Sequence, residues 1–224
     1  MLTWLRRGIS WWLDYAYVGW EQLKHFLGGR SAAGFSDGTL APVVLLPGVY
    51  ETWQFLRPVA KRMHELGHPV HVVTKLGYNR ATIADAAAIS QRYLDENDLR
   101  GVILIAHSKG GLIGKHQMVL DDTDSRITGM VAVNSPFGGS LYARFIPGRT
   151  IHAFSPRDKT LMMLGANATV NSRITSIYAE FDPHIPGGST LAGATNIELP
   201  VSGHFRPLGM PVLLAEIEKA VARL

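Results

Sequence analysis

The chain has 224 residues, of which 46% are hydrophobic and 18% charged, and this composition is typical of one globular domain with a sizeable core. The formal net charge is +4, but no run of lysine and arginine accompanies it, so nothing indicates a nucleic-acid partner. The absence of cysteine excludes a disulfide framework, a thiolate metal site and a cysteine nucleophile.

Residues 1–34 predict an N-terminal amphipathic helix followed by a linker. Apolar residues recur every three or four positions from Leu2 to Leu27, and four of the five tryptophans fall here. Asp14 interrupts the apolar run, so we expect neither a secretory signal nor a membrane span, and a cytoplasmic protein. Two hypotheses stay open for residues 1–27: a helix lying peripherally on a membrane or a partner, and a helix packed on the domain or in a dimer contact.

Residues 35–224 predict one domain in which strands alternate with helices. The expected strands are 41–46, 70–74, 102–106, 127–133, 173–179 and 196–201, and the expected helices are 55–66, 81–96, one from the 106–111 turn to about 120, 159–164 and 210–224. Most strands are apolar on both faces, which favours a mostly parallel sheet covered by helices on both sides. The loops after the strands should then hold the functional site.

The strand at 102–106 ends in a serine. The sequence A-H-S-K-G-G at 106–111 joins an apolar strand directly to a helical pattern. Ala106 and Gly110, two positions before and after Ser108, are small enough to allow the strained backbone of a nucleophile elbow. The alternative interpretation is a serine that only caps the helix.

A nucleophilic serine needs a base and an acid, and later strand ends offer both. Asp182 follows the strand at 173–179, and His204 follows the strand at 196–201. The chain order Ser108, Asp182, His204 is that of an α/β-hydrolase triad. Glu180 competes with Asp182 as the acid. His184 competes with His204 as the base, but it is close to Asp182 in sequence, and we expect it to line the rim of the site.

The stretch from Pro42 to Leu224 resembles α/β-hydrolases of the small bacterial lipase and esterase kind. A-H-S-x-G-G at 106–111 is similar to the elbow of compact bacterial lipases, and Pro47-Gly48-Val49 takes the place of their His-Gly-x turn. N-S-P-F-G-G-S at 134–140 and S-G-H-F at 202–205 are similar to two further loops of that family. The resemblance implies a compact α/β-hydrolase fold that lacks the first two strands and needs no cofactor.

The resemblance also implies an oxyanion hole made by the backbone N–H groups of Val49 and Lys109. Lys109 stands where methionine or glutamine is frequent in the family. We expect its side chain to point to solvent rather than to favour anionic substrates. His107, beside the serine, is expected to pack behind the site or to support it.

One further motif and one further segment need an interpretation. His64-Glu65-Leu66-Gly67-His68 matches the H-E-x-x-H zinc motif, but Gly67 and Pro69 end the helix that would bring both histidines to one face, so we expect no metal. Apolar side chains in residues 135–172 predict a small cap or lid over an acyl pocket. The alternative is ordinary core beneath a loop.

These features together predict a serine hydrolase that cleaves carboxylic esters, with a lipid-like or acyl-chain ester as the small-molecule substrate. Ser108 would be the nucleophile, His204 the base and Asp182 the residue that orients it. An acyltransferase or a thioesterase would use the same three residues. A non-catalytic binding protein of the same fold is the alternative from a different class.

Overall fold

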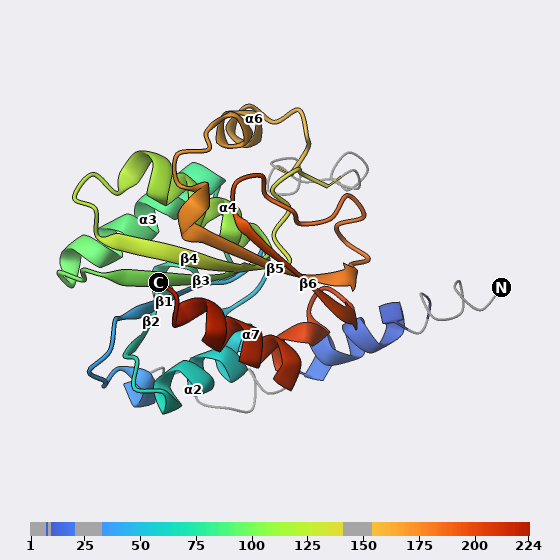
Figure 1. Ribbon diagram of the computed structural model, residues 1–224, viewed down its shortest axis with the longest axis horizontal. Coiled ribbons are helices and arrows are strands. Elements are labelled where there is room, and N and C mark those ends of the chain that lie inside the picture. The colour runs from blue at the N-terminus through green and yellow to red at the C-terminus, as the bar shows by residue number, and fades with distance from the viewer. Residues whose placement is uncertain (1–7, 9, 21–32, 141–153) are drawn as a thin grey trace.

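The computed structural model describes residues 8, 10–20, 33–140 and 154–224. Within them, six strands form one all-parallel sheet in the order β2-β1-β3-β4-β5-β6 (Figure 1). The strands are β1 (Val43–Leu46), β2 (Val70–Val72), β3 (Val102–His107), β4 (Ile127–Val133), β5 (Ile174–Phe181) and β6 (Thr195–Ser202). The expected parallel sheet is therefore confirmed, and no described strand precedes β1.

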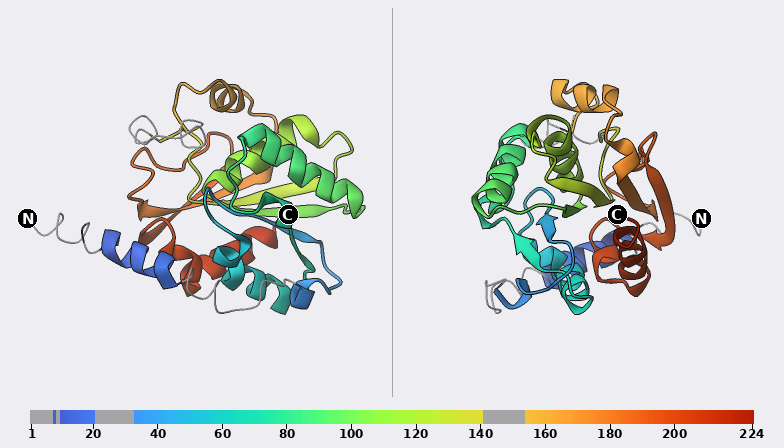
Figure 2. Two further views of the ribbon diagram at one scale, coloured as in Figure 1. Left: turned by 180° about the vertical axis from the view of Figure 1, so that it is seen from behind. Right: turned by 60° about the vertical axis from the view of Figure 1, so that its left-hand side comes forward.

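Helices cover both faces of this sheet (Figures 1 and 2). One face carries α3 (Ile83–Glu96), α4 (Lys109–His116) and α6 (Lys159–Ala166); the other carries α2 (Arg57–Glu65), α7 (Pro211–Val221) and a helix over residues 10–20. The shorter helical turns are η1 (Ala33–Phe35), η2 (Trp53–Leu56), η3 (Thr74–Leu76), the π-helical η4 (Gln117–Asp121), η6 (Asn171–Arg173) and η7 (Arg206–Gly209).

The central strands are buried on both faces because alternate side chains enter two separate cores. In β1, Val44 and Leu46 pack with α3, α4 and α6, whereas Val43 and Leu45 pack with α2 and α7. All four of these side chains are fully buried. This double burial explains the unbroken apolar runs in the strands, and it leaves polar side chains to the loops at the strand ends.

Several element boundaries differ from the sequence expectation. The strand expected at 70–74 ends at Val72, because Thr74 already begins η3. The helix expected from residue 81 begins at Ile83, since the Thr82 hydroxyl caps it by accepting a hydrogen bond from the Asp85 N–H at 3.1 Å. The helix expected at 55–66 begins as the 3₁₀ turn η2, and α2 follows with a proline in its first turn.

Parts of three expected segments lie outside the described residues. They are both ends of the N-terminal helix expected over 1–27, most of the linker at 28–34 and the middle of the cap at 135–172. The helix expected at 159–164 is present as α6. The carboxylate of Asp158 caps its N-terminus by accepting hydrogen bonds from the N–H groups of Thr160 and Leu161. Among the described helices, none has both the length and the apolar character needed to cross a membrane.

Candidate active site

Three strand ends bring Ser108, Asp182 and His204 to one edge of the sheet. Ser108 joins β3 to α4, Asp182 follows the last residue of β5, and His204 lies two residues beyond β6. Parallel strands all end at the same edge, so residues distant in sequence meet there. The structure therefore brings together the three residues that the sequence analysis selected.

Ser108 has the strained backbone expected of a tight strand-to-helix turn. Its φ is 52° and its ψ is −121°, in a region that residues with a Cβ seldom adopt. A Cβ on Gly110 would overlap the carbonyl oxygen of Leu46, and one on Gly111 would overlap the Ser135 hydroxyl. Gly110 thus lets α4 begin close to the end of β1, and Gly111 lets it begin close to the end of β4, which holds the serine in this turn.

A chain of hydrogen bonds runs through the three residues. His204 Nε2 lies 2.9 Å from Ser108 Oγ, and His204 Nδ1 lies 2.7 Å from Asp182 Oδ2. The other carboxylate oxygen of Asp182 accepts the N–H groups of His184 and Ile185 at 2.8 and 3.1 Å. Since the carboxylate only accepts, His204 carries its proton on Nδ1 and can accept the Ser108 hydroxyl proton on Nε2.

The electrostatics of the buried pair support this proton arrangement. Burial alone would raise the pKa of Asp182, but the charge of His204 and its hydrogen bond outweigh burial, and the pKa lies below its ordinary value. Burial alone would lower the pKa of His204, but Asp182 outweighs it, and that pKa is raised. The carboxylate therefore stabilises a positive charge that develops on the imidazole.

The competing residues have other contacts. The Glu180 side chain is exposed and makes no hydrogen bond to His204 within the described residues. The His184 ring packs against that of His204 with ring centres 4.9 Å apart and a tilt of 43°, and its Nε2 lies 3.1 Å from the Tyr15 hydroxyl. Burial, together with the charge of His204, lowers the pKa of His184 to about 4. His184 is therefore a neutral ring beside His204 and Asp182, and it is not the base.

His107 supports the site from behind, and its partner was missed in the sequence. The two carboxylate oxygens of Glu51 lie 2.8 and 2.9 Å from His107 Nδ1, and the other nitrogen of His107 lies 2.9 Å from the His204 carbonyl oxygen. Glu51 also accepts the Gly48 N–H at 2.9 Å. The only sequence signal for Glu51 was a carboxylate in the turn after a buried strand.

A second missed residue comes from the N-terminal helix. Asp14 is fully buried, and its carboxylate accepts the N–H groups of His204, Phe205 and Arg206 at 3.0, 2.9 and 2.8 Å. In the sequence it was only an interruption of an apolar run. Of the two hypotheses for residues 1–27, these contacts show that the described part of the helix packs on the domain, without testing a lipid or partner contact.

The expected oxyanion-hole donors lie in two turns next to Ser108. Lys109 is the first residue of α4, and Val49 follows β1. In the described part of the chain, neither backbone N–H donates a hydrogen bond. Asn79 fixes the turn after β1 by donating from Nδ2 to the Pro47 carbonyl at 2.7 Å. Two free N–H groups near a nucleophile are what an oxyanion would require.

The expectation for the Lys109 side chain was wrong. It is fully buried, and its Nζ donates to the carbonyl oxygens of Asn79, at 2.9 Å, and Ala81. Burial lowers the pKa of Lys109 to about 8. The lysine points under the 79–81 segment instead of into solvent because carbonyl oxygens there replace water around the ammonium group. It ties that segment to the start of α4.

Two groups of side chains have the spacing of metal ligands. In the described residues these are Glu51 with His107 and His204, and Asp182 with His184 and His204. Both need His204, whose two nitrogens already bond Ser108 and Asp182. The H-E-x-x-H motif forms no such group among the described residues, and the ring of His68 bonds the Ala41 carbonyl oxygen.

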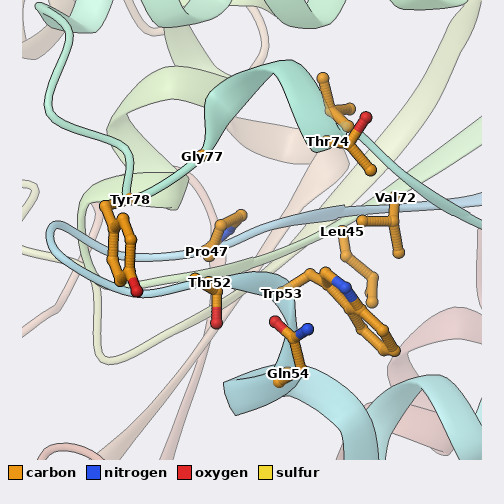
Figure 3. A pocket seen from close by; sticks show the side chains of 10 residues that line it. Leu45, Pro47, Thr52, Trp53, Gln54, Val72, Thr74, Gly77 and Tyr78 are labelled. Carbon is orange, nitrogen blue, oxygen red and sulfur yellow. The ribbon is translucent and has the colours of Figure 1, made fainter. Parts of the chain in front are cut away.

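Within the described part of the chain, cavities lie on two sides of this edge of the sheet. One, of about 310 Å³, lies between η2 and η3 beside Pro47, with Leu45, Val72 and Trp53 as apolar walls (Figure 3). The other, of about 680 Å³, lies between Trp11 and the loop after β5 that contains Asp182. Both volumes suit a small organic ligand. Ser108 lines neither of them.

Comparison with known proteins identifies the fold. No protein-family model and no curated protein sequence matches the chain. Among solved structures, a mature lipase of Bacillus licheniformis superposes with a TM-score of 0.61, 13% identity, and coverage of 83% of this chain and 92% of that chain. A carboxylesterase of Nitrososphaera gargenis superposes with a TM-score of 0.58 and 11% identity, over 82% of this chain and 92% of that chain. A Mycobacterium tuberculosis protein named as a non-heme bromoperoxidase superposes with a TM-score of 0.64 and 15% identity, over 84% of this chain and 94% of that chain.

The chain thus has the α/β-hydrolase fold, as the sequence resemblance implied. At these identities the likeness establishes the fold, and the three names show that one fold serves different chemistries. Function must therefore be argued from the site.

Proposed function

We propose that this protein is a serine hydrolase that cleaves carboxylic esters through an acyl-enzyme. The observation that carries the proposal is the buried chain from Ser108 Oγ through His204 to Asp182, with contacts of 2.9 and 2.7 Å. Ser108 would attack the ester carbonyl carbon while His204 Nε2 takes its proton. The N–H groups of Val49 and Lys109 would hold the oxyanion.

The second half of the reaction reverses these roles. As the acyl–oxygen bond breaks, His204 gives its proton to the leaving alcohol, and the acyl group stays on Ser108. Water then attacks the acyl carbon, His204 takes the water proton, and Ser108 recovers it when the carboxylic acid leaves. Asp182 keeps the imidazole in the required tautomer throughout and stabilises its transient positive charge.

A lipid-like or acyl-chain ester is the substrate class we propose. The lipase and the carboxylesterase among the structural neighbours act on esters by name, and this supports the class without fixing a chain length. Met162 on α6, in the expected cap, is 61% exposed and offers adaptable apolar surface. Transfer of the acyl group to an acceptor other than water is the second candidate, supported by the same three residues.

Ester hydrolysis is tested with p-nitrophenyl esters whose acyl chains have two to sixteen carbons. We expect turnover by the wild type, its loss in Ser108→Ala, and covalent labelling of Ser108 by a fluorophosphonate. Well-folded protein that shows neither turnover nor label would contradict the proposal and favour a binding protein. Added alcohols and thiols distinguish a hydrolase from an acyltransferase, since only the latter gives mainly transfer products.

We also propose that the outer face of the helix over residues 10–20 rests on a lipid surface. Asp14, its one charged residue, is buried, whereas four of its five aromatic side chains are exposed; the fifth, Tyr17, is partly buried. The exposed fractions are 39% for Trp11, 71% for Trp12, 50% for Tyr15 and 57% for Trp20. Tryptophan and tyrosine favour the headgroup level of a bilayer, and Arg6, Arg7 and Lys24 flank the helix in sequence, which suits an anionic surface.

Flotation with anionic phosphatidylglycerol vesicles tests this contact. We expect the wild type to float, Trp12→Ala to float less, and high salt to weaken binding. Val212→Ala removes an apolar side chain that is 40% exposed on α7 and should change nothing. Failure of the wild type to float, or a dimer that Trp12→Ala dissociates, would contradict a lipid contact.

A further inference from the structure

The loop that carries His204 is held by a residue about 190 positions earlier in the chain. Three consecutive N–H groups, of His204, Phe205 and Arg206, all point to the carboxylate of Asp14. These groups open the 3₁₀ turn η7, so Asp14 acts as its N-terminal cap from a different element. A negative group at such an end is favoured by both the donors and the local dipole.

The fit between the helix and the loop is close. Gly203 has a φ of 121°, and a Cβ there would lie 2.7 Å from Asp14 Oδ1. The neighbouring Tyr15 hydroxyl contacts the ring of His184, which packs at a tilt against that of His204. Nδ1 of the neutral His184 ring lies 4.0 Å from Asp14 Oδ2, and no lysine or arginine side chain forms an ion pair with Asp14 in the described residues. Backbone N–H groups, and not a cation, therefore satisfy the buried carboxylate.

Both polar groups of the His204 backbone are thereby fixed. Its N–H donates to Asp14, and its carbonyl oxygen accepts from His107 Nε2 and Asn134 Nδ2, each at 2.9 Å. The carbonyl oxygen of His204 is held by the domain, whereas its N–H bonds only Asp14 of the N-terminal helix among the described residues. The place of the imidazole relative to Ser108 therefore depends on a helix outside the sheet-and-helix domain.

We propose that Asp14 is a positioning residue for His204, so that the N-terminal helix completes the active site. The proposal rests on the ester hydrolase function proposed above. Without the carboxylate, three N–H groups lose their acceptor, the loop relaxes, and the contact between His204 Nε2 and Ser108 Oγ lengthens. A displacement of about 1 Å at a reacting group can cost about a hundredfold in rate. The negative charge of Asp14 also adds to the raised pKa of His204.

Two variants separate the geometry of Asp14 from its charge. Asp14→Asn is nearly isosteric but replaces one of the two acceptor oxygens by an NH₂ group, which cannot accept from the N–H donor that it faces. We expect kcat to fall about tenfold to a hundredfold with KM nearly unchanged, and the acid limb of kcat/KM to move to lower pH. Asp14→Glu keeps the charge but displaces it by one methylene. We therefore expect kcat to fall while the acid limb of the kcat/KM profile stays at its wild-type pH.

Ser10→Ala is the matched control. Ser10 is buried one helical turn before Asp14, and its hydroxyl has no hydrogen-bond partner among the described residues. The change should leave kcat and the pH limb at wild-type values. All variants are assayed on a water-soluble short-chain ester at a temperature where circular dichroism shows them fully folded.

NMR supplies a readout that does not depend on turnover. In Asp14→Asn we expect faster hydrogen exchange of the His204, Phe205 and Arg206 amides and a lower titration midpoint of the His204 ring. An active wild type with an equally active Asp14→Asn overturns the positioning role and leaves the hydrolase intact. An inactive, unlabelled wild type overturns the hydrolase, and unchanged amides and ring titration in Asp14→Asn would then overturn the positioning role separately.

Discussion

The ring of His107 lies between the carboxylate of Glu51 and the backbone of His204. Its Nδ1 is 2.8 Å from Glu51 Oε1, and its Nε2 is 2.9 Å from the His204 carbonyl oxygen. Both neighbours accept hydrogen bonds and neither ionised carboxylate nor carbonyl can donate one. With both of its nitrogens bonded, the His107 ring joins the buried Glu51 carboxylate to the backbone of His204.

Breaking this buried hydrogen-bonded pair should destabilise the protein strongly. We expect His107→Leu to lower the free energy of unfolding by about 3–5 kcal/mol, because it leaves the Glu51 carboxylate buried with only the Gly48 N–H as a partner. Adding Glu51→Gln to that variant should restore part of the loss. Urea unfolding of the two single variants and the double variant measures the coupling, and additive effects would contradict the pair.

The pH dependence of hydrolysis should report the His204–Asp182 pair. His204 must be neutral to take the Ser108 proton, and its pKa is raised, so kcat/KM should fall as pH drops through a value above the ordinary 6.5. Asp182→Asn removes the group that raises this pKa and leaves the burial that lowers it. The limb should then move to lower pH while the maximal rate falls about 10⁴-fold. A limb that stays in place would contradict the pairing.

The strained turn at Ser108 should tolerate no side chain at Gly110. Gly110→Ala places a Cβ against the Leu46 carbonyl oxygen, which is backbone and cannot move aside easily. We expect a loss of about 2 kcal/mol or more in unfolding free energy together with loss of activity. Gly165→Ala in α6, where a Cβ meets nothing within 4 Å, should be neutral or stabilising by about 0.5 kcal/mol. Equal thermal shifts for the two variants would contradict this explanation.

Lys115 should weaken the fold at neutral pH. Its side chain is 1% exposed, its Nζ has no hydrogen-bond partner among the described residues, and burial lowers its pKa from 10.5 to about 8. Lys115→Met should therefore stabilise the protein by about 1–3 kcal/mol at pH 7. Lys61→Met, at a side chain that is 71% exposed, is the control and should have little effect.

The same lysine predicts how stability changes with pH. Between pH 8 and 10.5 the unfolded chain binds more protons at this position than the folded chain, so the free energy of unfolding should rise with pH across that window. Lys109, whose pKa is also lowered to about 8, should contribute in the same direction. Lys115→Met should reduce the slope without abolishing it. An unchanged slope in chemical unfolding would show that Lys115 is solvated.

Local patterns were sufficient for much of the fold and for the three site residues. The sequence predicted all six strands, and for the inner strands the reason is burial on both faces, which requires unbroken apolar runs; the edge strand β6 is largely exposed. Ser108 was identifiable because its strained turn requires small neighbours. Asp182 and His204 could be selected because parallel strands end at one edge of the sheet, so residues just after them are brought together.

Long-range contacts decided the rest of the site. Asp14 lies 190 positions from His204, and Glu51 lies 56 positions from His107, so neither pairing leaves a local pattern. The Lys109 side chain was assigned to solvent because its neighbours in sequence do not reveal the Asn79 and Ala81 carbonyl oxygens that replace water around it. Burial of a charge depends on partners that only tertiary packing supplies. The sequence therefore determined where a nucleophile, a base and an acid stand, and the tertiary structure determined which buried charges hold them in place.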